Sequence, residues 1–151
     1  MPQENPVKHV LVLVDGTTSS YRAADTAILV AGRNGATLTA MAIVEHSTLR
    51  QLLRVRILVA AEMDEFERDL DASMRGHLSE IRLRALRQNV NTETVLLAGN
   101  TASLLPKFVA EHKVDLVVVA AFRSKDVLRD MIARQRQMIV DHAPCPVLVV
   151  K

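Results

Sequence analysis

Residues 9–20 read His-Val-Leu-Val-Leu-Val-Asp-Gly-Thr-Thr-Ser-Ser. A short run of β-branched and apolar residues that ends at once in a polar, Gly-containing turn is typical of a buried strand. Ser19 and Ser20 can cap a helix in which alanines and Ile28 recur at helical spacing until Gly32 and Gly35 end the pattern. The segment therefore predicts a strand, a turn and a helix.

Four further short apolar runs are predicted as strands, at residues 37–44, 92–97, 115–120 and 146–150. Helices are predicted between them. The longest carries an apolar stripe with three- and four-residue steps, made of Val59, Met63, Phe66, Leu70, Met74, Leu78, Ile81 and Ala85. Another helix covers residues 104–112 behind a cap at Asn100 or Thr101, and a final helix includes residues 127–139. Strands that alternate with helices favour a parallel sheet with helices on both faces.

The composition indicates one α/β domain. The chain has 151 residues, 49% of them hydrophobic, which is enough for a substantial core. We expect residues 1–7 to be a flexible N-terminus and residues 8–151 to form the domain. The formal charge of +2 and the interleaved acids do not indicate a nucleic-acid partner.

The cysteine content and the hydropathy of the sequence indicate in which cellular compartment the protein resides. Cys145 is the one cysteine, so no intramolecular disulfide can form, and a reducing cytoplasm fits best. The first residues lack the pattern of a signal peptide, and no uncharged run reaches the roughly 20 residues that span a bilayer. We expect a soluble cytoplasmic protein without membrane insertion.

Charge is divided along the long predicted helix. Acidic residues fill its first half and arginines dominate its second half; the acids are Glu62, Asp64, Glu65, Glu67, Asp69 and Asp71, and the arginines are Arg75, Arg82, Arg84 and Arg87. This polarity complements the helix dipole. Its simplest interpretation is a solvated face.

Four segments carry a resemblance to a known family. They are residues 9–20, Ala-Gly-Asn-Thr-Ala at 98–102, Val-Asp-Leu-Val-Val-Val-Ala at 114–120, and Asp-His-Ala-Pro-Cys-Pro-Val-Leu-Val-Val-Lys at 141–151. In type and order they resemble the universal stress proteins, over essentially the whole chain after the first seven residues. The resemblance implies a Rossmann-like sheet, of the adenine nucleotide alpha hydrolase-like type, with strand order 3-2-1-4-5.

The resemblance also implies an interface and a site. The interface is a homodimer contact through the last strand, with Val147, Leu148, Val149 and Val150. The site is an adenine-nucleotide site in which Asp15 and Thr17 after the first strand, and Ile43 at the end of the second, contact the ligand.

The phosphate-binding glycines of the ATP-binding branch are missing. That branch needs Gly-x-x-Gly, nine residues, and Gly followed by Ser or Thr, because glycines let backbone N–H groups approach phosphate. Counting back from Pro146, these positions hold Ala120, Arg123, Ala133 and Arg134. We therefore expect no conventional ATP cofactor.

The arginines leave an alternative open. Arg123, Arg134 and Arg136 can bind an anion through their side chains, with ATP or another adenine nucleotide as the ligand. The simpler interpretation is that they are solvated and paired with Asp126 or Asp130 at helical spacing.

Catalytic and metal-binding motifs are missing from the sequence. The five histidines are scattered, and there is no cysteine cluster, nucleophile elbow or Gly-x-x-x-x-Gly-Lys loop. Asp15 is either a ligand contact or a turn and helix-capping residue. The segment 47–61, with three arginines among apolar residues, either packs on the sheet or forms a membrane-surface or partner-binding helix.

The sequence leaves two hypotheses for the function of the protein. The first is a non-enzymatic stress-response or regulatory homodimer that acts through contacts with an unidentified protein partner. The alternative is an adenine-nucleotide-binding switch with a non-standard, arginine-based phosphate site. ATP hydrolysis is the weakest hypothesis, because the phosphate loop is absent.

Overall fold

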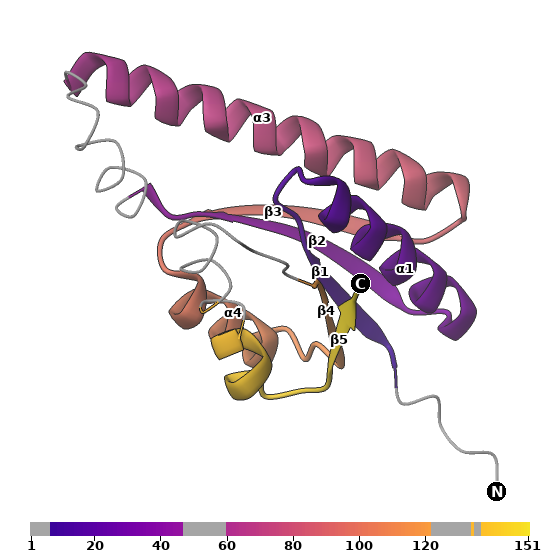
Figure 1. The fold of residues 1–151 in the computed structure, drawn as a ribbon. Helices are drawn as coiled ribbons and strands as arrows, with labels where there is room; N and C mark the ends of the chain where they lie inside the picture. The colour runs from indigo at the N-terminus through magenta and orange to yellow at the C-terminus, as the bar shows by residue number, and fades with distance from the viewer. Residues whose placement is uncertain (1–6, 47–59, 122–133, 135–136) are drawn as a thin grey trace, which may run out of the picture.

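The computed structural model describes residues 7–46, 60–121, 134 and 137–151. Its five strands form one sheet in the order β3-β2-β1-β4-β5, and every neighbouring pair is parallel (Figure 1). The strands are β1 (His9–Leu13), β2 (Thr37–Val44), β3 (Thr92–Ala98), β4 (Leu116–Ala120) and β5 (Val147–Val150). The predicted parallel sheet and its order are confirmed.

Helices cover both faces of this sheet. In Figure 1, α1 (Thr18–Asn34) and α3 (Ala60–Arg87) lie on one face, and α4 (Thr101–Glu111) lies on the other together with helical residues 137–142. Two separate hydrophobic clusters match these faces: Ala27 and Ile81 belong to one, whereas Leu105 and Ile139 belong to the other. The predicted helices on both faces are therefore confirmed.

β1 is buried on both sides and joins the two clusters. Val10 and Val12 pack in the cluster under α1 and α3, while Leu11 packs in the cluster under α4. All three side chains are fully buried. Successive side chains of a strand point to opposite faces, so a strand covered on both sides needs apolar residues throughout.

The cap of α1 differs from the predicted Ser19 or Ser20. Thr17 is the N-cap: its backbone is extended, with φ −75° and ψ 156°, and its hydroxyl accepts the N–H of Ser20 at 3.1 Å. The helix starts earlier than predicted because the turn after β1 already places Thr17 in this geometry. It also continues through Gly32 and ends at Gly35, which has the left-handed φ of +61°.

The apolar stripe of α3 is buried in only part of the helix. Leu78, Ile81 and Ala85 are buried, whereas Phe66, a member of the same stripe, is 44% exposed. Figure 1 shows the first turns of α3 extending beyond the sheet. Periodicity identifies the apolar face of a helix, but it does not show how far the opposing sheet reaches.

Candidate functional site

The carboxyl ends of β1, β2 and β3 meet at one edge of the sheet, because the three strands are parallel. Gly99, in the loop after β3, donates its N–H to the carbonyl of Val44 at 3.0 Å. This bond holds the ends of β2 and β3 together. Parallel α/β sheets bind ligands beyond this edge, and Asp15 and Ile43 both lie at it.

Asp15 organises the turn after β1. Its Oδ1 accepts the N–H of Thr17 at 2.9 Å and the hydroxyl of Thr17 at 2.6 Å. Thr17 in turn caps α1, and the hydroxyl of Ser20 accepts the N–H of Asp15 at 3.3 Å. Asp15 thus has the turn role that was one of its two interpretations, and Thr17 has a capping role that the sequence did not assign to it. Contact of either residue with a ligand stays a prediction.

α3 packs directly on this turn through His77. A Cβ built on Gly16 would lie 2.6 Å from Nε2 of His77, and Gly16 has a φ of +82°. On the other side of the ring, Nδ1 of His77 lies 2.7 Å from the hydroxyl of Tyr21. Sequence reasoning missed this contact, because nothing in the local pattern around His77 points to a turn so distant along the chain.

The start of α4 already has a carboxylate partner. Glu45, just after β2, accepts the N–H of Thr101 on Oε1 at 3.2 Å. Asn100 is the N-cap, the first of the two predicted alternatives, and its Oδ1 accepts the N–H of Ser103 at 3.3 Å. A carboxylate at a helix N-terminus is favoured by the helix dipole. The sequence placed residues 43–46 and 99–101 at this edge, but the contact between Glu45 and Thr101 was not predicted.

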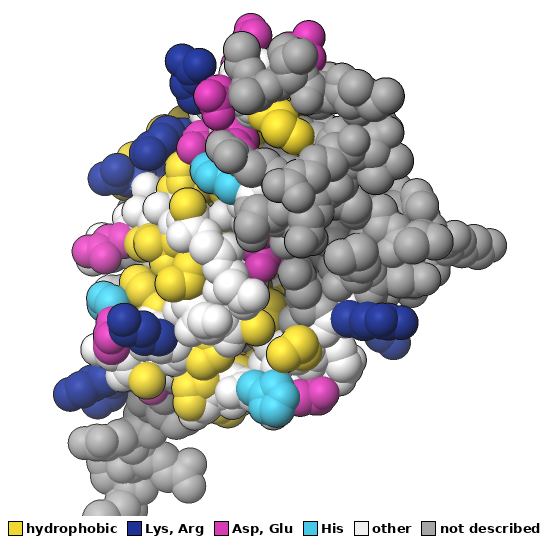
Figure 2. Space-filling view, turned by 90° about the vertical axis from the view of Figure 1, so that its left-hand side faces the viewer, with side chains coloured by type: hydrophobic (Ala, Val, Ile, Leu, Met, Phe, Trp, Pro, Cys, Tyr) yellow, Lys and Arg dark blue, Asp and Glu magenta, His cyan; other side chains and the backbone are white. Residues whose placement is uncertain are grey.

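His46 pairs with α3 at the same edge. Its Nε2 lies 3.1 Å from Oδ1 of Asp71, and both side chains are partly exposed. The pair therefore ties the end of β2 to the acidic half of α3. Figure 2, which views the molecule from the left-hand side of Figure 1, shows acidic side chains gathered near the top, where α3 begins.

Ile43 lies among apolar side chains on the α4 face. Leu13, Ile43 and Leu97, near the carboxyl ends of three adjacent strands, are all partly buried against the cluster that contains Leu105. Asp15 follows β1 directly, so the acidic turn and this apolar group flank the same edge.

The structure describes only some of the residues at the positions of the family's phosphate-binding glycines. Ala120, at the first glycine position, ends β4 and is buried in the core under α1. Arg134 is an exposed helical residue. Arg123 and Ala133 lie outside the described residues, as does the segment 47–59, so the arginine-based site and most of the segment 47–61 remain predictions.

The outer strand β5 pairs with β4 alone among the described residues. Val147 packs toward the α4 face, Leu148 and Val150 pack toward the α1 face, and Val149 is 43% exposed. The side of β5 away from β4 therefore presents backbone N–H and C=O groups that take part in no strand pairing within the described chain.

Three described groups have displaced pKa values. Burial raises the pKa of Tyr21, with Glu80 adding to the rise and Arg84 opposing it. Burial likewise raises the pKa of the Cys145 thiol. The pKa of Arg84 is raised chiefly by its hydrogen bond to Asp25.

The described residues contain no group of three or more His, Cys, Asp or Glu side chains placed to hold a metal ion. In the same part of the chain, no helix combines the length and apolar character that crossing a membrane requires.

Comparison with known proteins identifies relatives of this fold. A protein of Staphylococcus haemolyticus, named as a universal stress protein, is 32% identical over 145 residues, which cover 95% of this chain and 84% of that one. Among solved structures, universal stress protein UspA from Lactobacillus plantarum is 25% identical, with a TM-score of 0.72 and coverage of 95% of this chain and 97% of that chain. A universal stress protein in complex with cAMP is 21% identical, with a TM-score of 0.70 and coverage of 95% and 96%.

The sequence from residue 6 to residue 151 also matches the family model described as the universal stress protein family. The match, the relatives and the sheet order β3-β2-β1-β4-β5 agree with the resemblance first seen at residues 9–20 and 141–151. The chain belongs to the universal stress protein family.

Proposed function

We propose that this chain is a non-enzymatic regulatory dimer of the stress response, which acts in the cytoplasm through contacts with other proteins and without a glycine-based ATP site. The open side of β5 is the observation that carries the proposal. The strand pairs with β4 alone among the described residues, and its Val149 is 43% exposed.

The backbone groups on an open strand edge of this kind need hydrogen-bond partners or protection from other chains. Unpaired backbone groups on an apolar strand invite another strand, and natural sheets protect such edges. Antiparallel pairing of β5 with β5 of a second copy provides that protection and extends one sheet across both copies. Such a contact has two-fold symmetry, so each stabilising interaction occurs twice. Pro144 and Pro146 precede the strand and restrict where pairing can start.

The residues at the glycine positions argue against the conventional ATP site. Ala120 is 4% exposed and packs in the core, where a backbone cradle for phosphate would need an open glycine. Arg123 and Ala133 replace the other two glycines. Residues with a Cβ rarely adopt the positive φ that glycine allows, so the backbone loses much of its freedom to surround an anion.

Glu45 adds an electrostatic argument. Its carboxylate already accepts the N–H of Thr101 in the first turn of α4. A helix N-terminus attracts anions through its unpaired N–H groups and its dipole. A negative charge in this position repels a second anion, which reduces the attraction of the α4 N-terminus for a phosphate.

A second candidate function is binding of an adenine nucleotide without the glycines. The apolar group Leu13, Ile43 and Leu97 favours it, because these side chains are partly buried at the edge where a nucleoside would lie. One relative of the same fold was solved in complex with cAMP. In this hypothesis Asp15 and Thr17 contact the nucleoside, and Arg123 and Arg134 hold the phosphate.

Nucleotide binding separates the two candidates. We expect native mass spectrometry of the purified protein to show a dimer without a bound nucleotide. We also expect calorimetry with ATP and Mg²⁺, or with cAMP, to give dissociation constants weaker than about 10 μM, which corresponds to roughly −7 kcal/mol. A co-purifying nucleotide, or tighter binding that Arg123→Ala and Arg134→Ala weaken, would favour the second candidate instead.

A further inference from the structure

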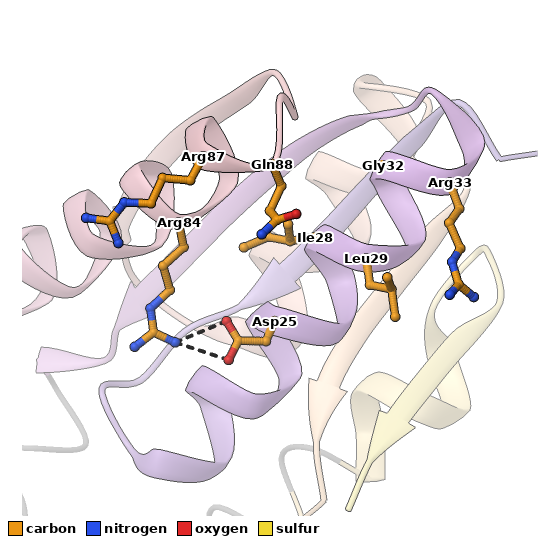
Figure 3. A pocket seen from close by; sticks show the side chains of 8 residues that line it. All are labelled: Asp25, Ile28, Leu29, Gly32, Arg33, Arg84, Arg87 and Gln88. Carbon is orange, nitrogen blue, oxygen red and sulfur yellow. Dashed lines mark hydrogen bonds and ion pairs between the residues drawn. The ribbon is translucent and has the colours of Figure 1, made fainter.

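A groove of about 630 Å³ lies between α1 and the C-terminal part of α3 (Figure 3). α1 lines it with Asp25, Leu29, Gly32 and Arg33, and α3 lines it with Arg84 and Arg87. All of these residues are described, and none was assigned a role by the sequence beyond helix formation or dipole complementation. The groove lies on outward surfaces of the two helices, away from the carboxyl edge of the sheet.

The groove carries apolar as well as polar side chains. Leu29 is 52% exposed, Ile28 is buried, and the polar Gln88 also lines the groove. Next to Leu29, Gly32 occupies an interior helix position, where glycine is the poorest residue apart from proline.

Packing does not require glycine at position 32. A Cβ there would lie 3.5 Å from Cγ2 of Val90, which is an ordinary van der Waals distance. Glycine at this position leaves the groove open beside Leu29.

Arg84 is committed to contacts inside the protein. Its Nη1 donates to the two carboxylate oxygens of Asp25 at 3.0 and 3.1 Å, and its Nε donates to Glu80 at 3.3 Å. Its guanidinium also lies 4.7 Å from the centre of the Tyr21 ring. The positive charge of Arg84 is thereby balanced locally, so it contributes little attraction for an outside ligand.

Arg33 and Arg87 differ from Arg84 in their ion pairs. Within the part of the chain that the structure describes, neither forms an ion pair with a carboxylate. Figure 3 shows them on opposite sides of Leu29 and Gly32, one projecting from the last turn of α1 and the other from the end of α3. Two positive charges thus flank Leu29 and Gly32.

The charge of α3 reinforces this pattern. Apart from Glu80, the acids of the helix lie in its first half, and its last turn contains Arg84 and Arg87. Arginines near a helix C-terminus also stabilise the helix dipole, which accounts for their charge. The dipole does not account for the exposed Leu29 or for Gly32 between the two arginines.

We propose that the groove between α1 and α3 binds a segment of a partner protein that presents an apolar side chain between two acidic ones. The apolar side chain packs on Leu29 over Gly32, and the acidic side chains pair with Arg33 and Arg87. Because the two arginines stand on opposite sides of Leu29, an elongated segment fits them better than a compact anion. This inference rests on the proposed function and names the surface through which the dimer contacts its partner.

Selection from a random peptide display library tests the groove. The bait is the wild-type protein, and the counter-selection uses the double variant Arg33→Glu and Arg87→Glu. We expect enrichment of peptides with Asp or Glu on both sides of Leu, Ile, Met or Phe. Reversal of both charges should weaken the binding of a labelled selected peptide by about tenfold or more in fluorescence anisotropy.

Matched variants control for charge and for exposed leucine. Arg75→Glu with Arg82→Glu reverses two exposed arginines of α3 outside the groove and should change the affinity by less than about threefold. Leu29→Ser should weaken binding, whereas Leu86→Ser, at a leucine that is 67% exposed and does not line the groove, should not. Circular dichroism establishes that each variant is folded.

Four results would overturn the proposal. The first is selected peptides without an acidic excess, and the second is equal binding to the wild type and the Arg33→Glu, Arg87→Glu variant. A change in oligomeric state of that variant in sedimentation would instead assign the groove to a second copy of this chain. Co-sedimentation of the wild type, but not the variant, with phosphatidylserine vesicles would assign it to a membrane surface.

The proposed function fails on other measurements. A wild-type monomer or a co-purifying nucleotide contradicts the proposed function, whatever the peptides show. A nucleotide-free dimer that selects no acidic peptide contradicts only the groove.

Discussion

The imidazole of His77 packs against Gly16, so closely that a Cβ on Gly16 would lie 2.6 Å from its Nε2. The ring is fixed on its other side by the hydroxyl of Tyr21, 2.7 Å from Nδ1. Through this contact α3 holds the turn that follows β1. The carboxyl edge of the sheet therefore depends on a helix far away in the sequence.

We expect Gly16→Ala to destabilise the protein by about 2 kcal/mol or more, because position 16 has a φ of +82° and no room for a Cβ. Gly35→Ala is the matched control: its φ is +61°, but nothing lies within 4 Å, so strain alone should cost about 1 kcal/mol. Urea unfolding measures both values. Equal costs would show that His77 does not restrict position 16.

Thr17→Ala should lower the free energy of unfolding by about 1 kcal/mol, because the helix loses the hydroxyl that accepts the N–H of Ser20. Thr18→Ala, at an exposed residue in the first turn, should change it by less than about 0.5 kcal/mol. Thermal unfolding of the two variants compares them directly. A larger loss at position 18 would contradict Thr17 as the cap.

Arg84→Lys should destabilise the protein by about 0.5–1 kcal/mol, because lysine cannot reproduce the contacts of the guanidinium with Asp25, Glu80 and the ring of Tyr21. The effect is modest because Arg84 and Asp25 are both partly exposed to solvent. Arg82→Lys, at an exposed neighbour, provides the control and should be nearly neutral. Indistinguishable unfolding curves for the two variants would argue against a role for this network.

Tyr21 is the one tyrosine of a chain without tryptophan, so its ionisation can be followed by ultraviolet absorbance. Burial raises the pKa of Tyr21, with a further contribution from Glu80, so the folded protein should titrate above the ordinary pKa of 10.0 and the protein in urea close to it. The raised pKa stabilises the folded state below pH 10, and this contribution is lost as the pH rises through the folded pKa.

Charge variants test the cause of the Tyr21 shift. Arg84 opposes the rise, so Arg84→Met should raise the pKa of Tyr21 further, whereas Glu80→Gln should lower it. Spectrophotometric titration of the folded variants gives the direction of each change. Shifts of the Tyr21 pKa in the opposite directions would show that Arg84 and Glu80 do not set the electrostatic potential at the phenol.

Val149→Glu should weaken the proposed dimer by about tenfold or more, because it places a negative charge on the strand at the two-fold contact, where the partner carries the same charge. Sedimentation equilibrium at micromolar concentration measures the change. Val140→Glu is a matched control on the helical residues 137–142, since Val140 is 37% exposed and Val149 is 43% exposed. A wild-type monomer, or equal effects of the two substitutions, would place the interface elsewhere.

Local patterns in the sequence determined the elements of this fold. The apolar run that starts at Val10 predicts β1 because a strand buried on both faces needs apolar residues throughout. Gly35 predicts the end of α1 because a left-handed φ is easy only for glycine. Alternation of strands and helices then predicts the parallel sheet, and the strand order came from the family resemblance of residues 9–20 and 141–151.

Where several residues fit the same local role equally well, the tertiary structure decided which of them takes it. Thr17, Ser19 and Ser20 all carry a hydroxyl that can cap a helix, and the path of the chain after β1 selects Thr17. Phe66 fits the apolar stripe of α3 as well as Leu78 does, but only Leu78 lies over the sheet. Periodicity describes one element, whereas burial depends on where its neighbours end.

The contacts that define the site and the groove also depend on tertiary structure. His77 against Gly16, Glu45 at the start of α4, and the groove between Leu29 and Arg87 all join elements that are distant along the chain. A single sequence carries no signal for such pairs, because each side chain is compatible with many partners until the sheet fixes the positions of the helices on its faces.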